Sequence, residues 1–143
     1  MDLQEPTNKM SKSADSDTGT VTLSEDLGSV AKKFKRAVTD SDGEVRFDPV
    51  AKPGVSNLLS ILGACTGIEP AALADDYTQY GPLKSATAEA VVELLRPIQE
   101  RMAELKADPA GTSELLRIGA DKARTVAATV TERARTNIGM LPR

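Results

Sequence analysis

Apolar residues recur at helical spacing in five successive segments of this chain, and this pattern constrains the fold more strongly than any other feature. Residues 24–39 show it most clearly, because apolar and basic side chains occupy opposite faces there. The chain has only four aromatic residues, so aliphatic side chains and alanine must build the core, which favours closely packed helices. The sequence therefore predicts an all-α fold, a four- to five-helix bundle, with further helices at residues 55–66, 70–76, 82–106 and 113–138.

The residues at the ends of these segments predict where helices begin and stop. Ser24 is the expected N-cap of the first helix, which should run to about Thr39. Gly67 is the expected stop of the second helix. Pro97 falls inside the fourth segment, where it predicts a kink or a break.

The periodicity also predicts which side chains face inward. In the first two helices these are Leu27, Val30, Ala31, Phe34, Val38, Val55, Leu58, Leu59, Leu62 and Cys65. In the long fourth helix they are Leu83, Val91, Leu94, Leu95, Ile98, Met102 and Leu105. The last helix carries a seam that would let another helix approach closely, made of Leu116, Ala120, Ala123, Ala127, Val130, Ala134 and Ile138.

Composition removes several classes of function. The chain has no histidine and one cysteine, which excludes imidazole acid–base catalysis, Ser-His triads, a disulfide framework and a cysteine zinc site within it. We interpret Cys65 as a core residue rather than a reactive thiol, because no basic neighbour at helical spacing would lower its pKa. A net charge of −3 argues against a generic basic nucleic-acid binder. With no signal peptide and no long apolar run, we expect a soluble cytoplasmic protein.

Residues 1–23 form an irregular arm without helical or strand periodicity. Lysines and hydroxyls gather in it at Lys9-Met10-Ser11-Lys12-Ser13. On physical grounds the arm is a mobile, polar, lysine-bearing loop, which is also the form of a lid that grasps phosphates.

The same five residues are letter for letter the KMSKS signature of class I aminoacyl-tRNA synthetases. The segments "AKKFKRAVTDSDGEVRFDP" and "KPGVSNLLSILGACTG" follow it, and they resemble the region after KMSKS in bacterial tryptophanyl-tRNA synthetases. "YGPLKSATAEAVVELLRPIQERMAEL" and the last helix resemble the C-terminal region of the same family. Phe34 departs from it, standing where the family more often has an aliphatic residue.

The resemblance implies a division of the chain and a missing part. Residues 1–23 would be the KMSKS loop at the tail end of a catalytic domain, and residues 24–143 the C-terminal helical domain on the anticodon side. The family's Rossmann-type catalytic domain, its HIGH motif and its tryptophan pocket precede KMSKS and are absent from this sequence. We therefore expect a truncated, C-terminal portion that is inactive by itself.

The resemblance also implies the chemistry of the loop. In the family, tryptophan attacks the α-phosphate of ATP, and the adenylate then esterifies tRNA(Trp). Lys9 and Lys12 would be catalytic, holding the phosphates as compact charges while pyrophosphate leaves. Ser11 and Ser13 would add donors to the ATP-binding set, and Met10 would anchor the loop. ATP would enter with Mg²⁺ as substrate, without a metal site in this chain, and the intact enzyme would be a homodimer with no membrane or DNA partner.

The acids and the glycine after KMSKS suit a lid that opens as well as closes, namely Asp15, Asp17 and Gly19. Two basic surfaces are open to two interpretations, RNA contact or solvated helix faces balanced by acids. They are Lys32, Lys33, Lys35 and Arg36, and the stripe of Arg117, Arg124 and Arg135. No motif marks a residue that contacts the anticodon.

Two further questions stay open from sequence. Tyr77 and Tyr80 could stack on an unpaired base or serve as core or hinge residues. An alternative to the synthetase portion is a stand-alone helical module that binds RNA or a protein. A third possibility, a helical DNA-binding protein, is weakened by the acidic charge and by the lack of a recognition helix.

Overall fold

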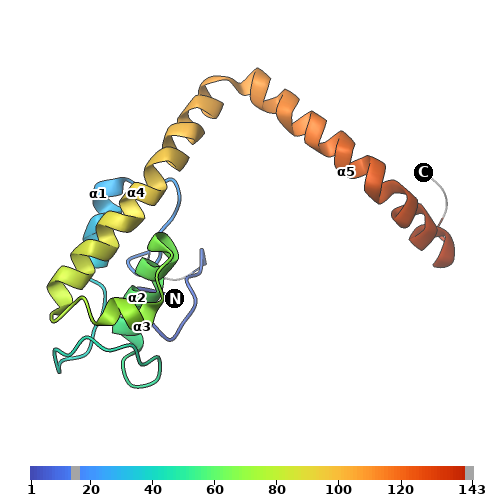
Figure 1. The fold of residues 1–143 in the computed structure, drawn as a ribbon. Coiled ribbons are helices and arrows are strands. Elements are labelled where there is room, and N and C mark those ends of the chain that lie inside the picture. The colour runs from blue at the N-terminus through green and yellow to red at the C-terminus, as the bar shows by residue number, and fades with distance from the viewer. Residues whose placement is uncertain (14–16, 141–143) are drawn as a thin grey trace. The chain divides into compact units, whose positions relative to one another are not determined.

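The computed structural model describes residues 1–13 and 17–140, and within these residues every regular element is a helix. This confirms the predicted all-α class (Figure 1). The elements are α1 (Leu27–Lys35), α2 (Pro53–Thr66), α3 (Pro70–Ala74), α4 (Tyr80–Ala107) and α5 (Pro109–Asn137).

Helix α1 is shorter at both ends than the sequence predicted. Its N-cap is Asp26, whose carboxylate accepts a hydrogen bond from the Ser29 N–H at 2.9 Å, so Ser24 is not the cap. The helix ends at Lys35 instead of Thr39 because the backbone N–H of Val38 donates to the carbonyl of Leu3 at 2.8 Å. A long-range bond thus replaces the next helical turn.

Helix α2 ends as predicted. Gly67 adopts φ 77°, the left-handed conformation that glycine tolerates, and its N–H donates to the carbonyl of Gly63 at 2.8 Å. At the other end, a Cβ on Gly54 would lie 2.2 Å from the carbonyl oxygen of Val38. Glycine is therefore needed where the start of α2 meets the chain that leaves α1.

Residues 1–100 form one compact unit with a single apolar core. It is built from α1–α4 and from Leu3 in the N-terminal arm. Most of the inward positions predicted for α1, α2 and α4 are buried or half-buried. Each fully buried aliphatic or aromatic side chain contributes about 1.5–3 kcal/mol to folding. Among the apolar side chains larger than alanine, those with the least exposure are Leu3, Val30, Phe34, Val55, Leu58, Leu59 and Leu83.

Three predicted core positions are wrong. Val38 is 43% exposed because it lies beyond the end of α1, and Leu94 and Ile98 on α4 are 52% and 37% exposed. Helix α4 is also continuous through Pro97, where a break was one expectation. Pro97 itself is exposed, so its ring lies on the solvent side of the helix.

Residues 101–143 form the second unit, which contains the end of α4 and all of α5. Asp108 caps α5 by accepting a hydrogen bond from the Gly111 N–H at 2.9 Å. Thr112 Oγ1 donates to the carbonyl of Leu105 at 2.8 Å across the turn. Helix α5 has no buried residue, and the side chains of the predicted small-residue seam are exposed.

Candidate functional site

The KMSKS residues lie in an irregular segment, as expected, with their polar side chains outward. Lys9, Ser11, Lys12 and Ser13 are exposed, whereas Met10 is half-buried and packs against the apolar core. The Oγ atoms of Ser11 and Ser13 are 3.0 Å apart, and the Ser13 N–H donates to Ser11 Oγ at 3.3 Å. The serines therefore stabilise a tight turn around Lys12.

The side chains of both signature lysines lack partners among the described residues. Among the described residues, no ion pair or hydrogen bond engages the side chain of Lys9 or Lys12. An exposed ammonium group keeps three donors for a ligand. This is the state expected of a group that meets an anionic substrate rather than one that holds the protein together.

The base of the loop is fixed by backbone hydrogen bonds. The Leu3 N–H donates to the carbonyl of Gly19 at 2.8 Å, and the Leu3 carbonyl accepts from Val38. Residues 4–18 thus leave and return at one point, as in an Ω-loop. We call this closure, formed by Asp2, Leu3 and Gly19, the neck.

Asp2 fills the neck and organises the first turn of the loop. Its Oδ1 accepts hydrogen bonds from the backbone N–H groups of Gln4 at 2.7 Å and Glu5 at 3.0 Å. A Cβ on Gly19 would lie 1.8 Å from the same carboxylate oxygen. Gly19 is buried at this close approach. Asp17 is exposed, and Asp15 lies outside the described residues.

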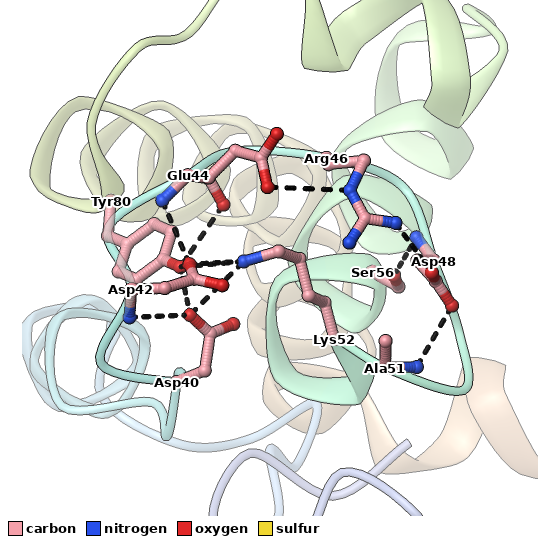
Figure 2. Close-up of polar contacts among 9 residues, drawn as sticks. All are labelled: Asp40, Asp42, Glu44, Arg46, Asp48, Ala51, Lys52, Ser56 and Tyr80. Carbon is pink, nitrogen blue, oxygen red and sulfur yellow. Dashed lines mark hydrogen bonds and ion pairs between the residues drawn. The ribbon is translucent and has the colours of Figure 1, made fainter.

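A cluster of polar side chains around Lys52 was not predicted from the sequence. Lys52, the residue before α2, is buried with 2% of its side chain exposed. Its Nζ forms ion pairs with Asp40, at 3.3 Å, and with Asp42, and it lies 3.3 Å from Tyr80 Oη (Figure 2). Three segments distant in sequence therefore meet at one ammonium group.

The protons of this cluster can be assigned by counting donors. Tyr80 Oη has three acceptors within reach, namely Asp40, Asp42 at 2.9 Å and the Glu44 carbonyl at 3.1 Å, but it carries only one proton. Lys52 supplies three donors, which reach Asp40, Asp42 and Tyr80 Oη, so each carboxylate has a donor whichever acceptor takes the tyrosine proton. The four side chains form one hydrogen-bonded network, which we call the Lys52 network (Lys52, Asp40, Asp42 and Tyr80).

The network changes the pKa values of its members. The Lys52 ammonium, followed by the Glu44 N–H, holds the pKa of Asp42 well below its usual range. Burial opposes the charge of Lys52, but hydrogen bonds to Asp42, Tyr80 and Asp40 outweigh it and raise its pKa. Burial and the adjacent carboxylates raise the pKa of Tyr80 to about 12. At neutral pH, Lys52 and Asp42 are therefore charged and Tyr80 is neutral.

Asp48 continues the same loop toward α2. Its carboxylate accepts from the N–H group of Ala51 at 2.9 Å and pairs with Arg46 at 2.6 Å (Figure 2). It also accepts from the N–H group of Val50 at 3.1 Å. These contacts, the Ala51 hydrogen bond first, lower the pKa of Asp48. The acids of residues 40–48 thus serve to close a loop on α2 and α4.

The two basic surfaces differ in how far they are neutralised. On α1, Lys33 is paired with Glu25 at 2.8 Å, while Lys32, Lys35 and Arg36 are exposed. On α5, Arg117 bonds Glu114 and Asp121, and Arg124 bonds Asp121. The balanced, solvated interpretation therefore fits Arg117 and Arg124 best.

The remaining candidates are half-buried. Tyr77 packs against the core, and Tyr80 serves the Lys52 network, which favours structural roles for both. Cys65 also packs against the core, and burial raises the pKa of its thiol, as its assignment to the core implied. Over residues 1–13 and 17–140, no cluster of acids and cysteine is placed to hold a metal ion, and no helix is long and apolar enough to cross a membrane.

Comparison with known proteins gives a consistent result. Residues 1–96 match the family described as tRNA synthetases class I (W and Y). The chain is 52% identical to tryptophan–tRNA ligase 1 of Streptomyces coelicolor over 142 residues, and 48% identical to tryptophan–tRNA ligase of Mycobacterium leprae over 143 residues. Each match includes 99% of this chain and 42% of the relative. The chain thus spans about two-fifths of the length of these relatives.

The fold gives the same answer. The crystal structure of tryptophanyl-tRNA synthetase from Mycoplasma pneumoniae matches 99% of this chain with a TM-score of 0.86 at 31% identity. The match includes 43% of that chain, its C-terminal helical part. The resemblance seen in the KMSKS signature therefore extends to the whole chain.

Proposed function

Since this chain belongs to the class I tRNA synthetases of the tryptophan and tyrosine type, we propose that it serves the ATP-dependent attachment of tryptophan to tRNA(Trp). Its part in that reaction is the KMSKS loop and the C-terminal helical domain. Residues 1–23 belong functionally to the catalytic domain, and residues 24–143 to the anticodon side. The reaction requires a catalytic domain in addition to these residues, so the chain alone is inactive.

The observation that carries this proposal is the contrast between a fixed neck and two uncommitted lysines. Pyrophosphate gathers negative charge as it leaves the α-phosphate, and preorganised cations stabilise that charge. Lys9 and Lys12 present such cations from a loop whose base is hydrogen-bonded to the core. Ser11 and Ser13 contribute hydroxyl or backbone donors, and Met10 holds the tip against the core.

The other components follow from the family and the charge of the substrates. ATP enters with Mg²⁺, which neutralises phosphate charge that two lysines leave uncompensated. The intact enzyme acts in the cytoplasm as a homodimer. The better candidate for phosphate contacts with tRNA is the exposed set at the end of α1, namely Lys32, Lys35 and Arg36, because no described acid forms an ion pair with them.

A chimera tests the proposal. Residues 1–143 replace the matched segment of the Streptomyces coelicolor relative, and tryptophan-dependent exchange of pyrophosphate into ATP is measured. We expect exchange by the chimera and none by the chain alone. Lys12→Ala should reduce exchange by about 10²–10³-fold, as removal of a transition-state donor does, whereas Lys106→Ala should not.

Two results would contradict the proposal. An inactive but folded chimera, or a Lys12→Ala chimera with full exchange, would remove the loop from the reaction. Tight, salt-dependent RNA binding by the chain alone, together with an inactive chimera, would favour the stand-alone helical module.

A further inference from the structure

The neck of the KMSKS loop is held by a buried side chain on α2 that the catalytic chemistry does not require. Asn57 is 7% exposed and lies between core residues of α2. Its Nδ2 donates to the carbonyl oxygens of Met1 and Asp2, each at 3.2 Å. Its Oδ1 accepts from the N-terminal ammonium group of Met1 at 3.0 Å.

Every polar group of this amide is therefore satisfied by one short stretch of backbone. A carbonyl oxygen can only accept, so the NH₂ group must face the carbonyls of residues 1 and 2. A buried amide with complete hydrogen bonding has one favoured position, because any shift leaves a donor or acceptor unpaired. Asn57 thus fixes where the chain enters the loop.

Hydrogen bonds of Asp2 connect Asn57 to the KMSKS signature. The Asp2 carbonyl bonds to Asn57, and the Asp2 N–H donates to the carbonyl of Asn8 at 2.8 Å. Asn8 is held further by its own N–H, which donates to the carbonyl of Glu5 at 2.8 Å. Asn8 directly precedes Lys9, so two hydrogen bonds connect α2 to the first catalytic lysine.

On this geometry, we propose that Asn57 is a positioning residue for the KMSKS loop, acting on Lys9 through Asp2 and Asn8. The inference rests on the proposed function for its kinetic consequence, but its structural part concerns this chain alone. The helical domain would therefore contribute to adenylate formation, because α2 would fix the position of the backbone at Lys9. Displacement of a catalytic group by about 1 Å can cost roughly 10²-fold in rate.

The first test uses the chain as it is. Asn57→Asp keeps the size of the side chain but places an acceptor against two carbonyls, and Asn57→Ala removes the donor of the same connection altogether. Hydrogen exchange is followed by NMR at the Asp2 and Leu3 amides, which bond to Asn8 and Gly19. We expect about 10-fold or faster exchange there, with amides of α4 unchanged. Ser60→Ala, on the exposed side of α2, is the control.

The second test uses the chimera. Both variants should lower kcat of pyrophosphate exchange by about 10-fold or more with KM for tryptophan unchanged, because the amino-acid pocket lies elsewhere. Unchanged exchange at the Asp2 and Leu3 amides in both variants would overturn the connection. Faster exchange at these amides with an unchanged kcat would overturn positioning. An inactive unmutated chimera would count against the proposed function, while the amide measurements would still decide the connection from Asn57.

Discussion

Lys9 and Lys12 differ from Lys52 in everything except residue type. The first two lie exposed on a loop that is closed by hydrogen bonds at its neck and packs against the core through Met10, and no described acid pairs with them. Lys52 is buried, with two carboxylates and a phenol around its ammonium group. The difference teaches that a lysine free of intramolecular partners is available for a ligand, whereas a buried, fully paired lysine stabilises the fold.

Substitution of Lys52 should have the largest effect on stability. Lys52→Met removes the charge that Asp40 and Asp42 share, so both carboxylates and Tyr80 lose their common partner. We expect Tm to fall by about 5–10 °C in circular dichroism, with no such loss for Lys106→Met. An unchanged or higher Tm would mean that the network does not stabilise the fold.

Substitution at the neck should have a smaller effect on stability. In Gly19→Ala, the new methyl group would meet the Asp2 carboxylate, and the chain must separate at the Leu3–Gly19 hydrogen bond. Tm should fall by about 2–4 °C, with faster exchange of the Leu3 amide. Gly81→Ala is the matched control, because no described residue outside its own stretch of α4 comes within 4 Å of its Cβ position. Equal Tm values for the two variants would show that loss of the Leu3–Gly19 hydrogen bond does not destabilise the fold.

Alkaline pH should weaken the Lys52 network in a defined window. Tyr80 has a pKa of about 12 in the fold and 10.0 ordinarily, so the unfolded chain loses this proton first as pH rises. Its contribution to stability is complete below pH 10 and is lost as pH rises toward 12. Thermal melts at pH 9 and 11.5 should show a steeper fall for the unmutated chain than for Tyr80→Phe. Parallel curves would contradict the assignment of a neutral, hydrogen-bonded phenol.

The smallest effect is expected on α5. Arg117 pairs with Glu114 and Asp121 across an exposed helix face, and such surface pairs add little to stability. Arg117→Gln should change Tm by about 1 °C or less. A larger fall in Tm would show that this arginine has a partner that stabilises the fold.

Local signals in the sequence predicted much of the molecule. The spelling of residues 9–13 identified the loop, and the 3.6-residue period located the helices, since both features lie in contiguous residues. The Gly67 stop was also predictable, because a left-handed C-cap needs glycine.

Long-range contacts explain what the sequence did not predict. The Lys52 network joins Asp40 and Asp42 to Lys52 and Tyr80. From the sequence, residues 39–54 indicated only turns, because the contacts of Lys52 depend on the tertiary fold. The early end of α1 depends on Leu3, which lies 35 residues before Val38. Asn57 offered one weak signal, a polar residue among the apolar positions of α2, and its partners are the carbonyls of residues 1 and 2.

The most direct test of the contrast between these lysines is competitive labelling of amino groups with acetic anhydride, read by mass spectrometry in the chimera with and without ATP and Mg²⁺. Without ATP, Lys9 and Lys12 should react as fast as the exposed Lys106, and Lys52 should react only after unfolding. ATP should slow the labelling of Lys9 and Lys12 and leave the labelling rate of Lys106 unchanged. Rapid labelling of Lys52 in the folded protein, or labelling of Lys9 and Lys12 that ignores ATP, would contradict the division of these lysines between substrate and fold.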